Sequence, residues 1–320
     1  MTSRAQSYAP FGLVLSGGGA RGLAHAGILR GMAHLGLRPT MIVGVSMGAV
    51  VGATYALNPF WYTAIKKMDV SRFPATPDFR KPGLGNRLRN LYAAQRVLSG
   101  MMFGWGIGEP AVAWGKAVLS ELTRGQTLET AEPPVIVSAT DIETGARVMI
   151  DTGPAVEALY ASSALAGIVP PAKRNGRWLV DGGYCDIAPV DALHSSGITR
   201  VIAVDASTST YGPRPKSGVG AMMRALEICQ NEHGRLRFDQ ADLVLRPNFD
   251  PPIEVLDFSN IRRCIAVGLD AVLRQHSLLA ELLGYEQLDR FEAQQATATV
   301  ARRPAPQSNQ NHGLNTESSE

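Results

Sequence analysis

The sequence predicts a three-layer α/β/α fold built around a mostly parallel central sheet. Short apolar runs alternate along the chain with segments that carry apolar residues at helical spacing, and glycine-rich turns separate the first of these units. With 45% hydrophobic residues among 320, the chain can bury a large core. Strands that alternate with helices favour a parallel sheet covered on both faces, in which functional groups gather at the carboxyl ends of the strands.

The first two units each have the pattern strand, turn, helix. Residues 11–15 form an apolar run that ends at a row of glycines, and residues 22–35 follow with apolar positions at helical spacing. Residues 41–45 repeat the apolar run. Residues 47–57 predict a second helix that ends at Asn58-Pro59, because proline cannot continue a helix. We therefore expect two βα units back to back.

The alternation continues toward the C-terminus. Runs rich in β-branched and other apolar residues predict strands at 135–139, 147–151, 178–180, 201–204 and 243–245. Apolar periodicity predicts helices at 155–165, 189–196, 220–238 and 261–283, the last being long and amphipathic. The intervening segment 63–132 is less regular and predicts mobile helices and a lid.

Three parts are expected along the chain. Residues 1–10 form a short N-terminal extension without a secretory signal, and residues 11–290 form the folded domain. Residues 291–320 are polar with almost no large apolar side chain, so they cannot offset the entropy of ordering. We expect this tail to be disordered.

Composition excludes several classes of protein. A net charge of +3 is too small to indicate nucleic-acid binding. The three cysteines are far apart, and the carboxylates and histidines show no ligand spacing, so we expect no disulfide framework, no metal and no cofactor. The longest apolar stretch, residues 41–57, contains glycines and falls short of a membrane span. These features favour a cytoplasmic protein, soluble or bound peripherally to a membrane.

A G-x-S-x-G pattern at residues 44–48 lies between a predicted strand and a predicted helix. Gly44 and Gly48 leave room for a tight strand-to-helix turn that projects the Ser46 hydroxyl outward, as in a nucleophile elbow. Chance alone places such a pattern in about one in five chains of this composition. The pattern could therefore equally be an ordinary packing turn, and the rest of the sequence has to distinguish this from a nucleophile elbow.

A second glycine-rich turn follows the first predicted strand. Its candidate functional residues are Gly17, Gly18, Gly19, Arg21 and Gly22. Free backbone N–H groups at a helix start favour negative charge, so this turn could cradle a phosphate or form an oxyanion hole. The residues that a Walker loop or a dinucleotide fingerprint requires are absent, and an oxyanion hole fits Ser46 better.

Ser46 needs a base, and Asp181 is the strongest candidate. The motif Asp181-Gly182-Gly183 follows a predicted strand, so its carboxylate should lie at the carboxyl edge of the sheet beside neighbours without side chains. None of the six histidines stands out, because the sequence places them in helices or in the tail. A conventional Ser-His-Asp hydrolase, for which His194 is the nearest candidate, is disfavoured because Ser46 follows a single βα unit.

Three blocks in this order resemble the catalytic blocks of bacterial patatin-like phospholipases. They are Gly-Gly-Gly-Ala-Arg-Gly at 17–22, Gly-Val-Ser-Met-Gly at 44–48 and Asp-Gly-Gly at 181–183. Segments 139–145, 161–171 and 201–205 also resemble the family. The sequence departs from the family at Ala166, where proline is frequent, and at Asp186, where asparagine is frequent. These departures concern the acyl pocket and the support of the Asp181 loop.

The resemblance implies a serine esterase or phospholipase that acts on lipid esters. Ser46 would attack the ester carbonyl, Asp181 would accept the Ser46 proton, and an acyl-enzyme would then be hydrolysed by water. Gly18 and Gly19 would supply oxyanion donors, while Arg21 would hold the loop or face the developing charge. Acyl transfer to another lipid by the same dyad stays open, as does a lipid-binding regulator without activity, against which the intact motifs argue.

Residues 66–96 carry eight Lys or Arg against two Asp, and apolar residues 101–105 follow. Basic residues suit anionic headgroups, and apolar and aromatic residues suit the bilayer interface. The segment 66–105 is therefore a lid, a face for an anionic membrane, part of the acyl pocket or an ordinary solvated surface. The sequence does not decide among these.

Overall fold

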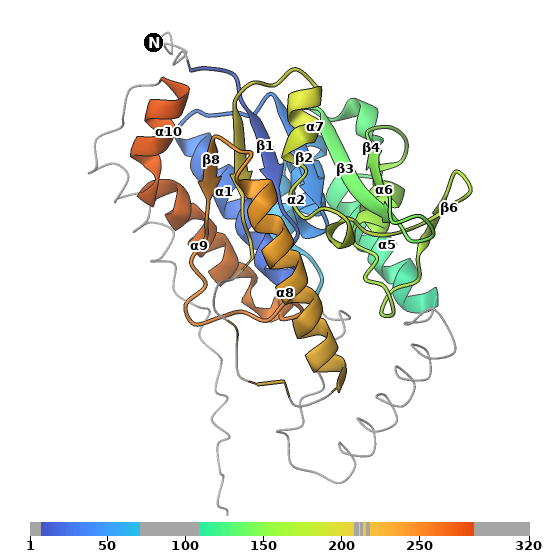
Figure 1. The fold of residues 1–320 in the computed structure, drawn as a ribbon. Coiled ribbons are helices and arrows are strands. Elements are labelled where there is room, and N and C mark those ends of the chain that lie inside the picture. The colour runs from blue at the N-terminus through green and yellow to red at the C-terminus, as the bar shows by residue number, and fades with distance from the viewer. Residues whose placement is uncertain (1–7, 71–108, 208–210, 212–213, 216–217, 285–320) are drawn as a thin grey trace, which may run out of the picture. The chain divides into compact units, whose positions relative to one another are not determined.

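The computed structural model describes residues 8–70, 109–207, 211, 214–215 and 218–284 (Figure 1). Its strands are β1 Gly12–Leu15, β2 Met41–Val45, β3 Val135–Asp141, β4 Arg147–Ile150, β5 Ala172–Arg174, β6 Arg177–Asp181, β7 Val201–Val204 and β8 Leu243–Leu245. Its helices are α1 Ala24–His34, α2 Met47–Leu57, α3 Trp61–Lys67, α5 Glu109–Thr123, α6 Ala155–Ser162, α7 Val190–Ser195, α8 Gly218–Phe238, α9 Ile261–Arg274 and α10 His276–Leu283. Short 3-10 turns occupy Gly19–Leu23, Leu128–Thr130, Gly182–Tyr184 and Phe258–Asn260.

Within these residues the strands form one mixed sheet in the order β5-β6-β3-β2-β1-β7-β8, with β4 also paired to β3. The five consecutive strands β3, β2, β1, β7 and β8 are parallel to one another. The pairs β3–β4, β3–β6 and β5–β6 are antiparallel. The predicted α/β fold with a mostly parallel sheet is therefore confirmed, with an antiparallel edge beyond β3.

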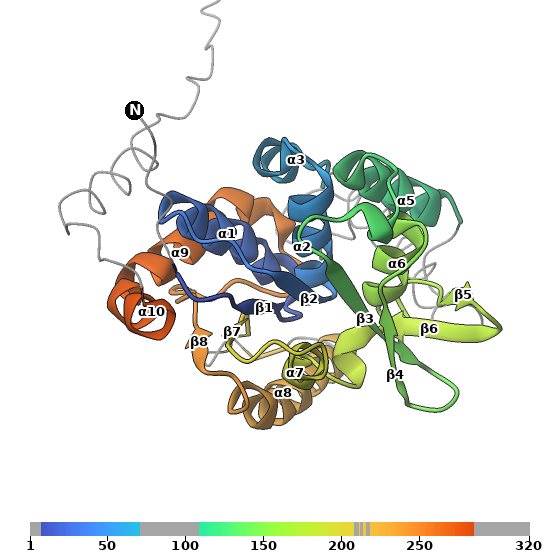
Figure 2. The same ribbon diagram turned by 90° about the horizontal axis from the view of Figure 1, so that it is seen from above.

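Helices cover both faces of the sheet (Figure 2). On one face, Leu15 and Ile42 lie against Gly52 of α2. On the other face, Val14 belongs to a buried cluster with Leu193 of α7 and Phe238 of α8. Neighbouring side chains of a strand point to opposite faces, and both faces are apolar here because both are buried. The glycine turns follow β1 and β2 at the carboxyl ends of these strands, outside the two covered faces.

Two glycines let α1 and α9 cross at close range. A Cβ added at Gly27 would lie 1.9 Å from the carbonyl oxygen of Ile265, and one at Gly268 would lie 1.9 Å from that of Ala24. No side chain fits at either distance, so the contact requires glycine at both positions. The crossing anchors α9 against the helix that follows the first glycine turn.

Several predicted elements need correction. The helix predicted at 261–283 is interrupted at Gln275, whose φ of −104° and ψ of 16° are not helical, so α9 and α10 are separate helices. Within the irregular segment 63–132, for which helices were predicted, the structure has α5 and most of α3. The hairpin strand β5 was not predicted. The predicted tail at 291–320, the apolar residues 101–105 and most of the basic segment 66–96 lie outside the described residues.

Candidate active site

Ser46 occupies a strained turn between β2 and α2. Its φ of 52° and ψ of −125° lie in a region that residues other than glycine rarely adopt. The two flanking glycines are required by space. A Cβ at Gly44 would lie 2.4 Å from the Cα of Ala49, and one at Gly48 would lie 2.2 Å from the carbonyl oxygen of Leu15. The local sequence therefore folds as a nucleophile elbow does.

The sheet register brings Ser46 and Asp181 together on the two sides of β3. Val45 pairs with Ser138 on one side, and Asp181 pairs with Ala139 on the other. The Ser46 hydroxyl donates a hydrogen bond of 2.6 Å to Oδ2 of Asp181. Asp181 thus lies beside Ser46 as expected, but the strand that carries it is not a parallel one as we predicted. Strand β6 runs antiparallel to β3 and ends with Asp181 opposite Ala139, so Asp181 reaches Ser46 although β6 does not belong to the parallel part of the sheet.

Burial controls the charge state of Asp181. The carboxyl is only 3% exposed, and this burial raises its pKa from 3.8 to about 6. Hydrogen bonds from the Ser46 hydroxyl and from the N–H of Gly183, at 2.8 Å, act in the opposite direction because they stabilise the carboxylate. At neutral pH the group is ionised and has a pKa suited to accepting a proton.

A chain of hydroxyl groups fixes the backbone around the pair. The N–H of Ser46 donates to Oγ of Ser162 at 2.8 Å, and that hydroxyl donates to the carbonyl of Ser138 at 2.6 Å. Oγ1 of Thr140 donates to the carbonyl of Asp181 at 2.9 Å. These supporting residues carry no sequence signal of their own. Ser162 appears only within the segment that resembles the family.

The first glycine turn lies directly against the elbow. A Cβ at Gly17 would lie 3.7 Å from the Cβ of Ser46, and one at Gly22 would lie 2.7 Å from the Cβ of Met47. Gly19 has a φ of 56°, and a Cβ there would lie 2.2 Å from the carbonyl oxygen of Val255. The N–H groups of Gly18 and Gly19 have no hydrogen-bond acceptor among the described residues. They are free to bind a developing negative charge.

Arg21 ties the turn to distant parts of the chain. Its guanidinium is buried and donates from Nη2 to Oε1 of Glu227 on α8 at 2.5 Å. Nη1 donates to the carbonyl of Ile253 at 3.3 Å. Arg21 was expected either to hold the glycine turn in place or to face the developing charge. These contacts support the first of these roles. The pairing with Glu227, which lies 206 residues away, left no pattern in the sequence.

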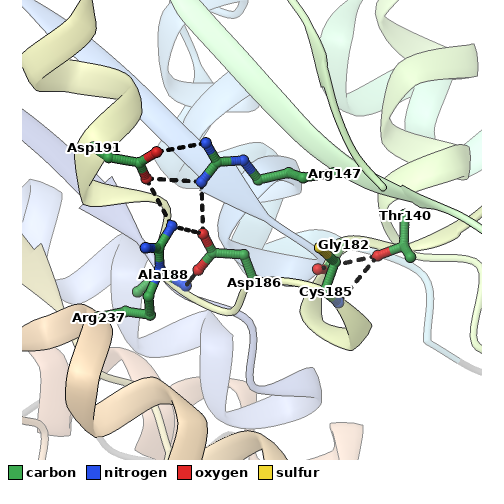
Figure 3. A network of polar contacts seen from close by, with 8 residues as sticks. All are labelled: Thr140, Arg147, Gly182, Cys185, Asp186, Ala188, Asp191 and Arg237. Carbon is green, nitrogen blue, oxygen red and sulfur yellow. Dashed lines mark hydrogen bonds and ion pairs between the residues drawn. The ribbon is translucent and has the colours of Figure 1, made fainter. Parts of the chain in front are cut away.

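A charged network braces the loop that follows Asp181 (Figure 3). Asp186 accepts from Nη1 of Arg147 at 2.6 Å and from Nη2 of Arg237, and both arginines also contact Asp191. The other Asp186 oxygen accepts from the N–H of Ala188 at 3.1 Å. The acidic residue at a position where the family often has asparagine is therefore matched by two cations. Gly182 has no room for a side chain, because a Cβ there would lie 2.3 Å from the carbonyl oxygen of Ser138.

An apolar cavity contains the Ser46–Asp181 pair. The glycine turn, Ser46 and Asp181 form its polar part, and helices α2, α5 and α6 contribute to its wall. Its apolar lining among the described residues includes Met47, Val50, Met68, Val118, Leu119, Leu165, Ile168, Ile187, Leu256 and Phe258. A wall of this kind suits a long hydrocarbon chain.

The histidines of the described residues lie away from this cavity, since none contributes to its lining. His25 is fully buried beneath the glycine turn, with Nε2 2.9 Å from the carbonyl of Ser16, and burial lowers its pKa to about 4. His194 is exposed on α7, with Nδ1 3.1 Å from the carbonyl of Ile198. His312 lies outside the described residues. Among the residues that the structure describes, the geometry therefore supplies a carboxylate partner for Ser46 and no imidazole.

The described part of the chain contains no group of three or more His, Cys, Asp or Glu side chains placed to hold a metal ion. None of its helices has the length and apolar character needed to cross a bilayer.

Comparison with known proteins gives a consistent family signal. The model of a family described as patatin-like phospholipase matches residues 13–194. Lysophospholipase NTE1 of Cryptococcus neoformans is 31% identical over 211 residues, which cover 63% of this chain and 12% of that protein. Mouse patatin-like phospholipase domain-containing protein 7 is 30% identical over 196 residues, which cover 60% of this chain and 13% of that protein. The match to this chain thus spans about an eighth of these relatives' length.

Among solved structures, VipD from Legionella pneumophila is similar with a TM-score of 0.41 and 12% sequence identity. That alignment covers 87% of this chain and 71% of the VipD chain.

Proposed function

Because the chain belongs to the patatin-like phospholipase family, we propose that it hydrolyses fatty-acyl ester bonds of phospholipids or lysophospholipids through Ser46 and Asp181. The observation that carries the proposal is the 2.6 Å hydrogen bond from the Ser46 hydroxyl to a buried carboxylate in an apolar cavity. The relatives named lysophospholipase add support for this substrate class.

In the first half of the reaction, Oγ of Ser46 attacks the ester carbonyl while its proton passes to Oδ2 of Asp181. The carbonyl oxygen becomes negative in the tetrahedral intermediate and accepts hydrogen bonds from the free N–H groups of Gly18 and Gly19. One such donor is worth about 3–4 kcal/mol in related chemistry. The intermediate then breaks the ester bond, the leaving alcohol takes the proton from Asp181, and the acyl group stays on Ser46.

In the second half, water attacks the acyl carbonyl and gives its proton to the Asp181 carboxylate. The same N–H groups stabilise the second oxyanion. The bond between Ser46 and the acyl group breaks, Oγ recovers the proton from Asp181, and a fatty acid leaves. One residue thus serves as base and then as acid in both halves, as its pKa of about 6 permits near neutral pH.

The apolar residues of the cavity explain why the substrate carries a fatty-acyl chain. The fatty-acyl chain lies against the apolar wall from α2, α5 and the 165–169 loop, which removes its methylene groups from water at about 0.8 kcal/mol each. A substrate of this kind resides in a membrane or micelle. The enzyme accordingly works bound peripherally at a lipid surface.

Incubation of the purified chain with defined phospholipids, lysophospholipids and short nitrophenyl esters tests this function. Mass spectrometry of the products should find free fatty acid and the complementary lysolipid or alcohol. Acyl groups found on another lipid or alcohol instead would assign the same dyad to acyl transfer. Lipid binding without any product, in a protein shown to be folded, would reduce it to a lipid-binding regulator.

A further inference from the structure

We propose that the aromatic and basic surface around α3 docks this protein onto an anionic lipid bilayer, beside the Ser46 cavity. We define the α3 surface by Phe60, Trp61, Tyr62, Lys66, Lys67 and Arg30. The inference rests on the proposed function only in that it assumes a substrate held in a membrane. Its own evidence comes from exposure, charge and the position of α3.

Phe60 is the most exposed of the large apolar side chains in the described residues, at 73%. A fixed turn presents it. The N–H of Phe60 donates to Oδ1 of Asn58 at 2.9 Å, and the buried Asn58 donates from Nδ2 to the carbonyl of Leu122 at 2.9 Å. The ring is therefore held in water by a well-anchored backbone. Such an exposed apolar group gains free energy when an apolar phase covers it.

The neighbouring aromatic residues have the character of interfacial anchors. The ring of Trp61 packs edgewise against the rings of Tyr55 and Tyr62. The distances between ring centres are 5.2 Å to Tyr55 and 5.5 Å to Tyr62. The guanidinium of Arg30 lies 5.3 Å from the Tyr62 ring centre, and the ammonium of Lys66 lies 5.4 Å from it. Tryptophan and tyrosine beside lysine and arginine are enriched at the level of lipid headgroups, because their apolar parts enter the interface while their polar ends stay hydrated.

The charge of this region selects the partner. Residues 8–70 contain five Lys or Arg, of which Arg21 is buried and paired with Glu227. Their one carboxylate, the exposed Asp69, accepts from Nε1 of Trp114 at 3.1 Å, so the cations Arg30, Lys66 and Lys67 leave the α3 surface positive. On α5, which packs against α3, the exposed Glu121 is offset by the exposed Arg124, which directly follows this helix. A second copy of the chain would bring the same positive charges face to face, which opposes self-association through this surface. An anionic bilayer supplies both the negative charge and the apolar phase that Phe60 requires.

The α3 surface is continuous with the cavity. Helix α3 lies beside α2 and α5 in Figure 2, and both of those helices contribute to the cavity wall. Met68, directly after the end of α3, is buried and lines the cavity together with Ser46. Docking through α3 therefore places a cavity wall next to the lipid, so that an acyl chain has a short path out of the bilayer.

Vesicle flotation of the full chain tests the proposal. Mixed phosphatidylcholine and phosphatidylglycerol vesicles are compared with pure phosphatidylcholine vesicles at low and high salt. We expect wild type to prefer the anionic vesicles and to dissociate from them as salt rises. Phe60→Ser should weaken binding about tenfold. The double variant Lys66→Gln/Lys67→Gln should weaken it about tenfold or more.

Leu236→Ser is the matched control, since Leu236 is 68% exposed but lies on α8, on the opposite face of the sheet. It should bind vesicles as wild type does. Phe60, Lys66, Lys67 and Leu236 do not line the cavity, so all variants should keep wild-type turnover of a soluble nitrophenyl ester. That turnover also shows that each variant is folded.

Several results would overturn the proposal. These are equal vesicle binding by all variants, an equal loss in Leu236→Ser, or no preference of wild type for anionic vesicles. A wild-type dimer in light scattering that Phe60→Ser converts to monomer would make the surface an interface between copies. A chain that lacks all ester hydrolysis but binds vesicles through Phe60 would instead refute the proposed hydrolase and leave the docking surface intact.

Discussion

Replacing Asp181 with asparagine should slow turnover by about a hundredfold or more and yet stabilise the folded protein at neutral pH. The carboxyl is buried, with a pKa raised from 3.8 to about 6, so between these values the folded chain keeps a proton that the unfolded chain has released. Stability therefore falls as pH rises through this window. A shift of about two pH units at ~1.4 kcal/mol per unit corresponds to a cost of roughly 3 kcal/mol at pH 8.

An asparagine side chain removes this cost and keeps the local contacts. Its amide oxygen can accept from the N–H of Gly183, and its NH₂ group can donate to the Ser46 hydroxyl after the hydroxyl rotates. We expect Asp181→Asn to be more stable than wild type by roughly 3 kcal/mol at about pH 8, and to approach wild type near about pH 4. Turnover should fall by about a hundredfold or more, because proton acceptance is lost.

Urea unfolding of both proteins across this pH range measures the effect. Asp186→Asn is the matched control, because that carboxylate accepts from two arginines and its neutralisation should destabilise the protein by about 1–3 kcal/mol. The same chemical change thus has opposite signs at two buried aspartates. If Asp181→Asn were no more stable than wild type at any pH in the range, the assigned burial cost would be wrong.

Four further predictions follow from the site. With a soluble ester, kcat/KM should rise with pH through about 6 as Asp181 ionises, and a flat profile across that value would contradict its role as base. His194→Ala should keep nearly full turnover, because His194 is exposed and bonded to local backbone; a folded but inactive variant would indicate a triad instead. Gly115→Leu should shorten the preferred acyl chain in a series of nitrophenyl esters, because Gly115 lines the cavity and a Cβ there meets no described atom within 4 Å; an unchanged chain-length profile would show that α5 does not bound the acyl chain. Treatment with a chelator should leave turnover unchanged, because backbone N–H groups stabilise the oxyanion; loss of turnover with recovery on added Ca²⁺ would reveal a metal requirement.

The elbow was predictable because its determinants are local. An apolar run, a serine between two glycines and a helical repeat follow one another within residues 41–57, and the structure has β2 and α2 at the predicted bounds. The glycines are required by contacts with Ala49 and Leu15, which any tight strand-to-helix turn against a neighbouring strand produces. Local steric demands of this kind leave a readable pattern in a single sequence.

The position of Asp181 was predicted for the wrong reason. The Asp-Gly-Gly motif marked a strand end, but strand direction depends on the hairpin that precedes it. Asn175 and Gly176 both have positive φ, and the Asn-Gly dipeptide is typical of such a two-residue turn. This signal could have shown that β6 is antiparallel to β5. The pairing of β6 with β3 depends on contacts between distant segments and left no local trace.

Ion pairs between distant residues could not be predicted from the sequence for the same reason. The pair of Arg21 with Glu227, and the pairs of Asp186 with Arg147 and with Arg237, join residues that are far apart in sequence. Isolated charged residues in a sequence look alike whether they are solvated or buried in a pair. The break at Gln275 was missed because the apolar repeat continues across it in α10.

Covalent labelling tests whether Ser46 is the nucleophile of a lipid acyl hydrolase. Wild type and Ser46→Ala are incubated with a fluorophosphonate probe, digested, and mapped by mass spectrometry, with lipid hydrolysis measured in parallel. We expect one probe adduct on Ser46 in wild type, and neither adduct nor hydrolysis in Ser46→Ala. An adduct on another residue, or hydrolysis retained by a folded Ser46→Ala, would contradict this role of Ser46.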